Sequence, residues 1–182
     1  MRIALTLSLA GGLALAACAS KPSASAGGGG SAAGQVRSAV ATLSPAAAGG
    51  ALGIVTFAAS GAQVDVHVLA TGLAPGSVHG FHVHENGNCA SPDFMGAGGH
   101  FNPGKQPHGP QDGPHHLGDM PSLLVDPTGR IDARFMLAGA TLTGAGGYVG
   151  HAVILHAGPD DYQTQPTGNS GGRISCGVIA AQ

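Results

Sequence analysis

The sequence predicts an all-β domain, an antiparallel sandwich or barrel that carries two long functional loops. Glycine accounts for 33 of the 182 residues, against an average of about 7 %, which favours turns and loops over long helices. About eight short segments are apolar and β-branched, and none has the period of a long helix. Two stretches, 86–114 and 158–172, have no periodicity and are rich in turn-forming residues. Long loops of this kind inside a compact domain are usually functional.

The first 34 residues are expected to precede the folded domain, and they begin with an export signal. Arg2 precedes an apolar run of about 15 residues, which is short for a membrane span of ~20 residues. The run ends in Leu-Ala-Ala-Cys18, which resembles the lipobox of bacterial lipoproteins. This resemblance implies a signal peptide over 1–17 and a lipid on Cys18. The alternative is an ordinary signal peptide with a chance cysteine.

Residues 18–34 are expected to form the lipidated cysteine and a flexible tether of Ala, Gly and Ser. Ala19 is not the aspartate associated with inner-membrane retention, so we expect export to the periplasm or cell envelope, with an outer-membrane anchor. The folded domain is then 35–182, which is long enough for one sizeable core.

Composition narrows the expected partners. Only 9 % of the residues are charged, the formal net charge is -2, and there is no basic block. We therefore expect no nucleic-acid partner, and no membrane contact beyond the N-terminal lipid. Ten histidines, beside two tyrosines and no tryptophan, are the anomaly of this composition.

The segment 63–69 shows the clearest strand pattern. Its valines alternate with polar residues, which predicts one buried face and places His67 on the solvated face. Gly61 is expected to join this strand to the preceding one as a hairpin. Further strands are expected at 36–43, 51–59, around 82–84, and at 120–125, 130–137, 148–156 and 173–180.

His82 and His84 are predicted to point to the same face of a strand, because side chains two residues apart do so. The simpler alternative is a pair on the wet face of that strand. His79 lies out of phase with them and is expected to be a hydrogen-bonded structural residue.

Further potential metal ligands follow along the chain. Six imidazoles and a carboxylate are enough for two sites, and imidazole-rich sites suit copper and zinc rather than calcium or magnesium. Three histidines with an aspartate suit zinc, whereas four histidines suit redox-active copper. The candidates are His82, His84, His100, His108, His116, Asp119 and His156.

With Cys18 assigned to the lipid, Cys89 and Cys176 remain in an exported domain, where disulfides persist. If they pair, the chain-entropy gain is roughly 4–5 kcal/mol. The alternative is two free buried thiols.

Four segments, in order, resemble the signature segments of copper/zinc superoxide dismutase, and the resemblance covers essentially all of 35–182. It implies an eight-stranded antiparallel Greek-key barrel with an immunoglobulin-like sandwich architecture. The segments are Gly80-Phe-His-Val-His-Glu85, Gly98-Gly-His-Phe-Asn-Pro103, His116-Leu-Gly-Asp119 and Gly168-Asn-Ser-Gly-Gly-Arg-Ile-Ser-Cys-Gly177.

The resemblance also implies roles for single residues, with one copper and one zinc ion per subunit. Asp160 would link a copper ligand to a zinc ligand, and Arg173 would receive the anion above the copper. The disulfide would help to place Arg173. Copper would be bound by His82, His84, His100 and His156, and zinc by His100, His108, His116 and Asp119, with His100 as the bridge.

Several nearby residues had to be chosen or set aside. His108 is chosen as a zinc ligand by its eight-residue offset from His100. His115 is expected to be solvated, because the His-Leu-Gly-Asp pattern begins at His116. His151 is left out of the site, and Lys105 is a weak candidate for steering an anion.

The implied function is dismutation of superoxide to dioxygen and hydrogen peroxide by alternate reduction and oxidation of the copper, as antioxidant defence of the cell envelope. Zinc would be structural. One alternative is a copper-buffering envelope protein without efficient turnover, and another is a structural relative that lacks ligands. The family contains monomers and dimers, so a homodimer is one expected form.

Overall fold

A computed structural model describes residues 35–46 and 50–182 of the chain. The chain divides into two units, 1–33 and 34–182, and the second is the domain described below. The predicted signal peptide, the lipidated Cys18 and the tether lie outside the described residues and remain predictions. Among the residues described, no helix has both the length and the apolar character needed to cross a membrane.

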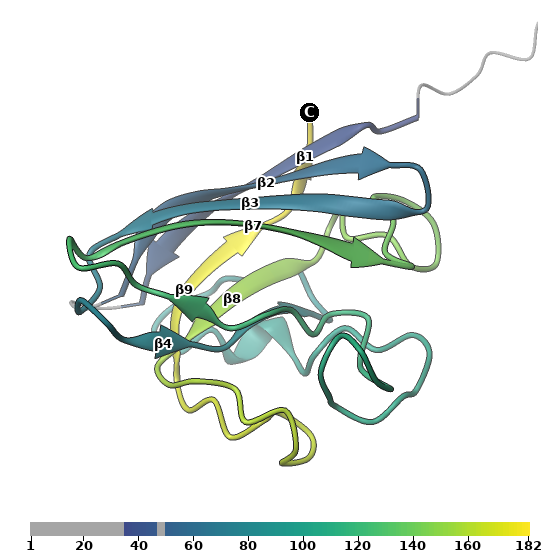
Figure 1. Cartoon of the computed structure of the whole chain (residues 1–182). Coiled ribbons are helices and arrows are strands. Elements are labelled where there is room, and N and C mark those ends of the chain that lie inside the picture. The colour runs from purple at the N-terminus through teal and green to yellow at the C-terminus, as the bar shows by residue number, and fades with distance from the viewer. Residues whose placement is uncertain (1–34, 47–49) are drawn as a thin grey trace, which may run out of the picture. The chain divides into compact units, whose positions relative to one another are not determined.

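The predicted all-β fold is confirmed. One layer contains β1 (Ser38–Pro45), β2 (Leu52–Ser60), β3 (Gln63–Thr71) and β7 (Arg130–Ala138). The other contains β5 (Phe81–His84), β8 (Ala152–His156) and β9 (Arg173–Val178), and the two layers face each other in Figure 1.

The layers form one curled antiparallel sheet of strand order β5-β8-β9-β1-β2-β3-β7. It curls at β1, which pairs with β2 along most of its length and with β9 at Ser44 and Pro45. Because β3 pairs with β7 and not with the next strand along the chain, the connections are of the Greek-key kind. The short elements are β4 (Val78–His79), β6 (Leu123–Leu124), β10 (Ala180–Ala181) and the 3-10 turn η1 (Met95–Ala97).

The alternation predicted for β3 is present. Val64, Val66 and Val68 are buried in the core between the layers, as the period-two pattern requires. His67 is not free in solvent as predicted, because its Nε2 lies 2.9 Å from Asp132 Oδ1 on β7 and its side chain is only 19 % exposed. Two partly polar strands that pair side by side can cover each other's side chains, which alternation within one strand does not reveal.

Two predicted strands are shorter in the structure. The apolar segment 148–156 is a strand only from Ala152, because Tyr148 and Val149 instead form loop hydrogen bonds with Thr141 and Leu142. Tyr148 is fully buried and its hydroxyl donates to the Leu117 carbonyl 2.5 Å away. Its apolar character therefore reflects core packing rather than strand pairing. The segment 120–125 likewise contributes only the two residues of β6.

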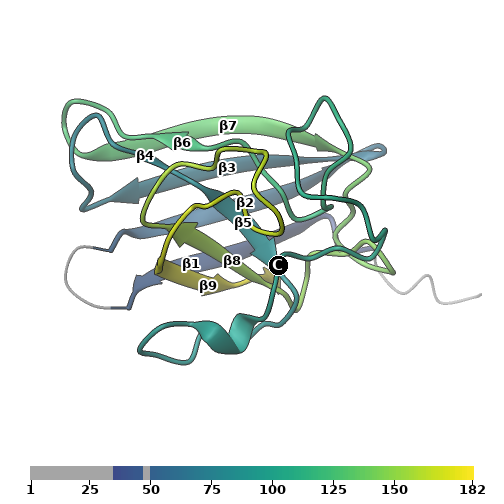
Figure 2. The same ribbon diagram turned by 90° about the horizontal axis from the view of Figure 1, so that it is seen from below.

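The two long loops lie on the same side of the domain, next to β5 and β8 (Figures 1 and 2). The sheets thus provide the scaffold, and the long loops project from one side of it.

Candidate metal centre

Strand β5 presents the first two ligand candidates. All four of its residues are buried; Phe81 and Val83 point into the core, whereas His82 and His84 face the opposite side. Both histidines are 0 % exposed, so the alternative of a pair on the wet face is wrong.

The first long loop returns beside β5 and brings the next candidates to it. Backbone bridges pair His84 with His100 and His82 with Asp119. This close return depends on Gly118, because a Cβ there would lie 2.2 Å from the Val83 carbonyl oxygen. Glycine is therefore required at this position. The two backbone bridges align ligands that lie up to 37 positions apart in sequence.

The far edge of the site comes from two later strands. His156 ends β8 and is the register partner of Arg173, the first residue of β9. A register shift between Leu155 and His156 lies at this edge, as bulges often do beside functional sites.

Two clusters of donor atoms result, each with its atoms within 4.8 Å of one another and all of its residues buried. They share one residue, His100. The first cluster contains His82, His84, His100 and His156, and the second contains His100, His108, His116 and Asp119.

Several donor atoms in these clusters have no hydrogen-bond partner. His82 Nδ1, His100 Nε2, His108 Nδ1 and His116 Nδ1 are buried and unpaired. His108 Nδ1 and His116 Nδ1 lie 3.0 and 3.3 Å from Asp119 Oδ1 without forming a hydrogen bond to it. Buried polar atoms are rarely left unpaired, and atoms that converge in this way fit metal ligation.

The opposite ring nitrogens are held by hydrogen bonds. His84 Nδ1 donates to the Gly98 carbonyl at 3.0 Å, and His156 Nδ1 donates to the Gly171 carbonyl at 3.2 Å. Such bonds fix the tautomer and orientation of ligating imidazoles.

Asp160 joins the two clusters from outside. Its Oδ2 accepts from His82 Nε2 at 2.7 Å, and its Oδ1 accepts from His108 Nε2 at 2.9 Å. A single buried carboxylate thus orients one imidazole of each cluster.

Burial keeps the first cluster neutral. Desolvation lowers the pKa of His84 to about 2, of His156 to about 3 and of His100 to about 4. Their nitrogen lone pairs are therefore free for a metal ion at neutral pH.

The second cluster carries a charged pair. Burial alone would raise the pKa of Asp119, but the hydrogen bond from His100 and the adjacent imidazoles of His108 and His116 hold it well below its usual range. Burial would lower the pKa of His108, yet the Asp119 and Asp160 carboxylates outweigh this effect and raise it to about 9. A metal ion at this cluster would therefore displace a proton from His108.

Arg173 is fixed beside the first cluster by two backbone carbonyls. Its guanidinium donates to Phe94 O at 2.6 Å and to Gly98 O at 2.5 Å. Gly98 O also accepts from His84, so one carbonyl positions both the arginine and a candidate ligand. A cleft is lined by His84, His156, Arg173 and loop residues that include Asp93.

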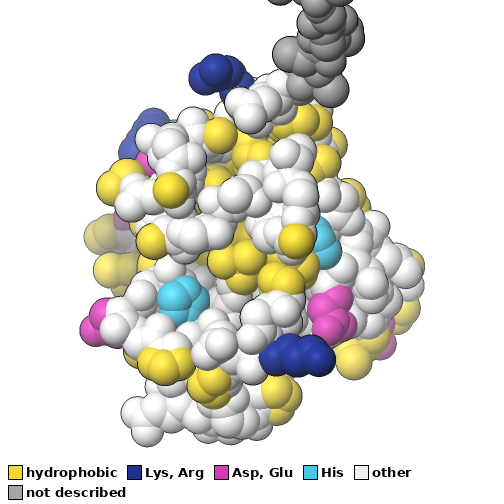
Figure 3. Space-filling view, turned by 90° about the vertical axis from the view of Figure 1, so that its right-hand side faces the viewer, with side chains coloured by type: hydrophobic (Ala, Val, Ile, Leu, Met, Phe, Trp, Pro, Cys, Tyr) yellow, Lys and Arg dark blue, Asp and Glu magenta, His cyan; other side chains and the backbone are white. Residues whose placement is uncertain are grey.

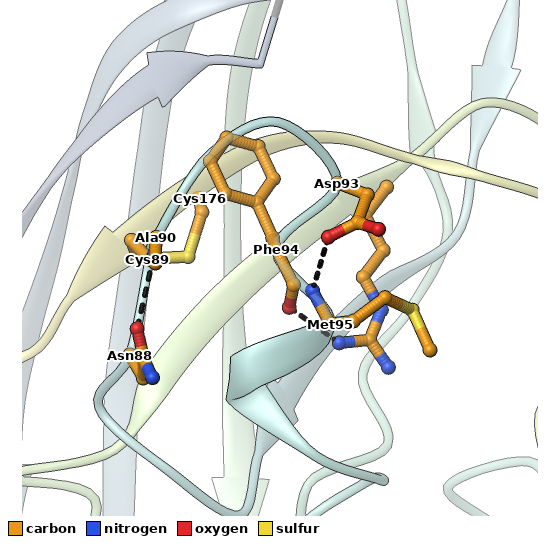
Figure 4. The surroundings of a disulfide bond; sticks show 8 residues. Asn88, Cys89, Ala90, Asp93, Phe94, Met95 and Cys176 are labelled. Carbon is orange, nitrogen blue, oxygen red and sulfur yellow. Dashed lines mark hydrogen bonds between the residues drawn. A yellow bond between two sulfur atoms is a disulfide. The ribbon is translucent and has the colours of Figure 1, made fainter.

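The predicted disulfide between Cys89 and Cys176 is confirmed. It ties the first long loop to β9, three residues beyond Arg173. Figure 4 shows the Phe94 ring beside this disulfide, with the Phe94 carbonyl directed at the guanidinium. Phe94 is 3 % exposed and has a φ of 56°, a left-handed conformation that non-glycine residues rarely adopt.

The remaining histidines lie around the clusters and form hydrogen bonds. His79 Nδ1 donates to the His156 carbonyl at 2.8 Å, in the structural role predicted for it. His151 Nδ1 donates to the His84 carbonyl at 3.1 Å, and its ring packs against Phe101 at an interplanar angle of 37°. His115 is half-buried and donates to Gly113 O, so it is less solvated than expected.

Some residues that support the site were not predicted from the sequence. Phe94 supplies an acceptor to Arg173, and Gln165 contacts the backbone of His108. Both lie in aperiodic loops, where no sequence signal of the kind used above marks them. Lys105, the weak steering candidate, is exposed and does not line the cleft.

Comparison with known proteins agrees with this geometry. A family profile described as copper/zinc superoxide dismutase (SODC) matches residues 51–179. The chain belongs to the copper/zinc superoxide dismutase family. The cofactors of this family are copper and zinc, and the two clusters offer one donor set for each.

Individual relatives support the assignment. A Cu-Zn superoxide dismutase of Deinococcus radiodurans is 41 % identical over 143 residues, which cover 71 % of this chain and 77 % of the relative. One from Aquifex aeolicus is 41 % identical over 121 residues, covering 63 % and 71 %. The crystal structure of the clock protein EA4 has a TM-score of 0.74 and 34 % identity, and the match covers 81 % of this chain and 96 % of that one.

Proposed function

We propose that the cluster of four histidines binds copper and that the cluster of three histidines and Asp119 binds zinc, with His100 as a bridge between the ions. The observation that carries this assignment is the position of His100 in both clusters. Its Nε2 is buried and unpaired, and its Nδ1 lies 2.8 Å from Asp119 Oδ1. One imidazole therefore offers one nitrogen to each site.

The protein is an enzyme that dismutes superoxide, converting two superoxide anions and two protons to dioxygen and hydrogen peroxide. Bound copper supplies the one-electron Cu(II)/Cu(I) couple, whereas zinc has no redox chemistry. Arg173 binds the anion, because its guanidinium stays charged and presents forked donors. His100 Nε2, which is buried and unpaired, would carry a proton only while Nδ1 is bound to zinc and Nε2 is not bound to copper.

Attraction of the substrate has to be local. Charged side chains are few and scattered on the face shown in Figure 3, in keeping with a charged content of 9 %. Arg173 therefore provides the positive charge of the cleft, and Asp93, which also lines the cleft, opposes it. Local fields of this kind raise the association rate of a charged substrate.

The experiment that tests this function combines metal analysis with superoxide decay on one purified sample. We expect one copper and one zinc per chain, and turnover far above that of the same concentration of free copper. Tight copper binding with decay no faster than free copper would instead identify a copper-buffering protein.

We also propose that the enzyme is exported and lipid-anchored through Cys18, in the envelope and most simply at the outer membrane. There it would protect the envelope from superoxide. The support is the lipobox-like end of the apolar run and the tether that follows it. An oxidising compartment also suits a domain with a disulfide.

The anchor is tested by Cys18→Ser in the full chain. We expect the variant to leave the membrane fraction while keeping its specific superoxide activity. If the variant sediments with membranes as the wild type does, the lipid anchor is wrong and the enzyme assignment is unaffected.

A further inference from the structure

His108, in the first long loop, is held in place by residues of the second long loop. His108 is 3 % exposed and lies in an irregular stretch that has no strand beside it. Buried backbone N–H and C=O groups need hydrogen-bond partners. In this stretch a side chain from 57 positions later in the sequence supplies both.

That side chain is Gln165. Its Oε1 accepts from the His108 backbone N–H at 2.8 Å, and its Nε2 donates to the His108 carbonyl at 2.8 Å. A carboxamide offers the same donor and acceptor as a peptide group. Gln165 thus pairs with His108 as a neighbouring strand would.

The same loop also holds the ring of His108, through the bond from Nε2 to Asp160 Oδ1. The loop approaches this bond closely at Gly168, where a Cβ would lie 1.8 Å from Asp160 Oδ1. The backbone and the side chain of His108 are therefore fixed by two residues of one loop, which leaves Nδ1 directed at Asp119 3.0 Å away.

We propose that Gln165 is a positioning residue for the zinc ligand His108 and slows the release of zinc. The inference rests on the proposed zinc assignment. Asp160 alone leaves the backbone of His108 free to shift within an irregular loop, and a shift there moves Nδ1 away from the cluster. The amide removes that freedom. Loss of partners that orient a ligand typically weakens metal affinity by about 10-fold to 100-fold.

The test replaces Gln165 with a residue of similar length that has no amide, Gln165→Met. Gln165 is exposed overall, so the variant is expected to fold. The matched control is Gln163→Met, on an exposed neighbour that contributes only main-chain groups to the hydrogen bonds of the described residues. Each protein is loaded with copper and zinc, and zinc release into excess chelator is followed by absorbance.

We expect Gln165→Met to release zinc about tenfold faster than the wild type, with Gln163→Met at the wild-type rate and copper content unchanged in both. A merely structural role would lower the unfolding midpoint of the metal-free protein and leave zinc release unchanged. That result, or equal acceleration in both variants, overturns the inference.

A third variant, His108→Ala, distinguishes a wrong role for Gln165 from a wrong assignment of zinc to this cluster. If His108→Ala retains zinc as the wild type does, the assignment of zinc to this cluster is wrong. If His108→Ala loses zinc but Gln165→Met releases it at the wild-type rate, the assignment stands and the role of Gln165 is refuted.

Discussion

At the scale of single residues, Arg173 illustrates how placement decides function. Its guanidinium has two acceptors, Phe94 O and Gly98 O, which hold it over the cleft without neutralising it. Carbonyl groups are neutral, so the positive charge remains available to an anion. A carboxylate in their place would have cancelled the charge.

Arg173→Glu is therefore expected to slow superoxide decay while copper stays bound. Reversing the charge removes the attraction and repels the substrate, and steering effects of this kind change association rates by at least about tenfold. The measurement is the second-order rate constant at several ionic strengths, beside copper content from atomic absorption. Arg134→Glu, on the outer side of the sheet, is the control, and loss of copper from Arg173→Glu would mean that the arginine has a different role.

His82 and His84 were predictable as candidate donors because their signal is local, whereas the division of the candidates into two ligand sets came from the resemblance to the family. The two-residue spacing of His82 and His84 defines a shared strand face, and the chemistry of imidazole restricts the metals. The acceptor role of Phe94 and the amide of Gln165 were not predictable from spacing, because both act across loops without a period. Such contacts depend on how two distant segments pack together, and the sequence of either segment alone does not reveal that packing.

At the scale of elements, the disulfide joins the first long loop to the last strand of the site. Cys89 precedes Phe94 on the loop, and Cys176 follows Arg173 on β9. The cross-link therefore holds two segments together. One is β9, whose Arg173 donates a hydrogen bond, and the other is the loop, whose Phe94 carbonyl accepts that hydrogen bond. It also packs against the small apolar cluster that contains Phe94 and Ile154.

Replacing both cysteines, Cys89→Ala with Cys176→Ala, is expected to lower the free energy of unfolding of the metal-free protein by about 2–5 kcal/mol. The double variant avoids leaving a single reactive thiol. Urea unfolding followed by circular dichroism gives the free energy, and superoxide decay of the metal-loaded protein should also fall because Phe94 is less fixed. An unchanged unfolding midpoint would show that packing, not the cross-link, holds the loop.

The strands themselves were well predicted where alternation is strong, as in β3 and β7. The prediction failed at Tyr148, because a buried aromatic in a loop looks the same in sequence as a strand residue. The hydrogen bond from its hydroxyl to Leu117 O is a tertiary contact, and hydrophobic pattern alone does not distinguish it from sheet packing.

At the scale of the whole domain, ligation and stability are linked through protonation. Without metal, the folded protein buries a group of neutral imidazoles beside two carboxylates. Protonating those buried imidazoles costs free energy, and this cost lowers the free energy of unfolding. Metal ions that bind the folded state and not the unfolded chain stabilise it by mass action. The metal-free protein should therefore be the less stable form and the more sensitive to acid.

The direction of that sensitivity follows from the pKa values of His84, His156 and His100, lowered by burial to about 2, 3 and 4. In the unfolded chain these groups titrate near 6.5, so below that pH the unfolded state binds more protons. Their contribution is complete above about pH 6.5 and is lost as the pH falls through the folded values, by up to about 1.4 kcal/mol per pH unit for each histidine. The raised pKa of His108, about 9, acts above 6.5 and does not offset this loss.

We therefore expect the free energy of unfolding of the metal-free protein to fall between pH 6.5 and pH 4.5, before the carboxylates begin to titrate. Urea unfolding at several pH values in the presence of a chelator provides the measurement. His84→Gln, which removes one buried imidazole, should reduce the slope of the pH dependence. A free energy that stays level or rises over this range would show that the buried histidines are solvated in the metal-free protein and that the cluster is formed only when metal binds.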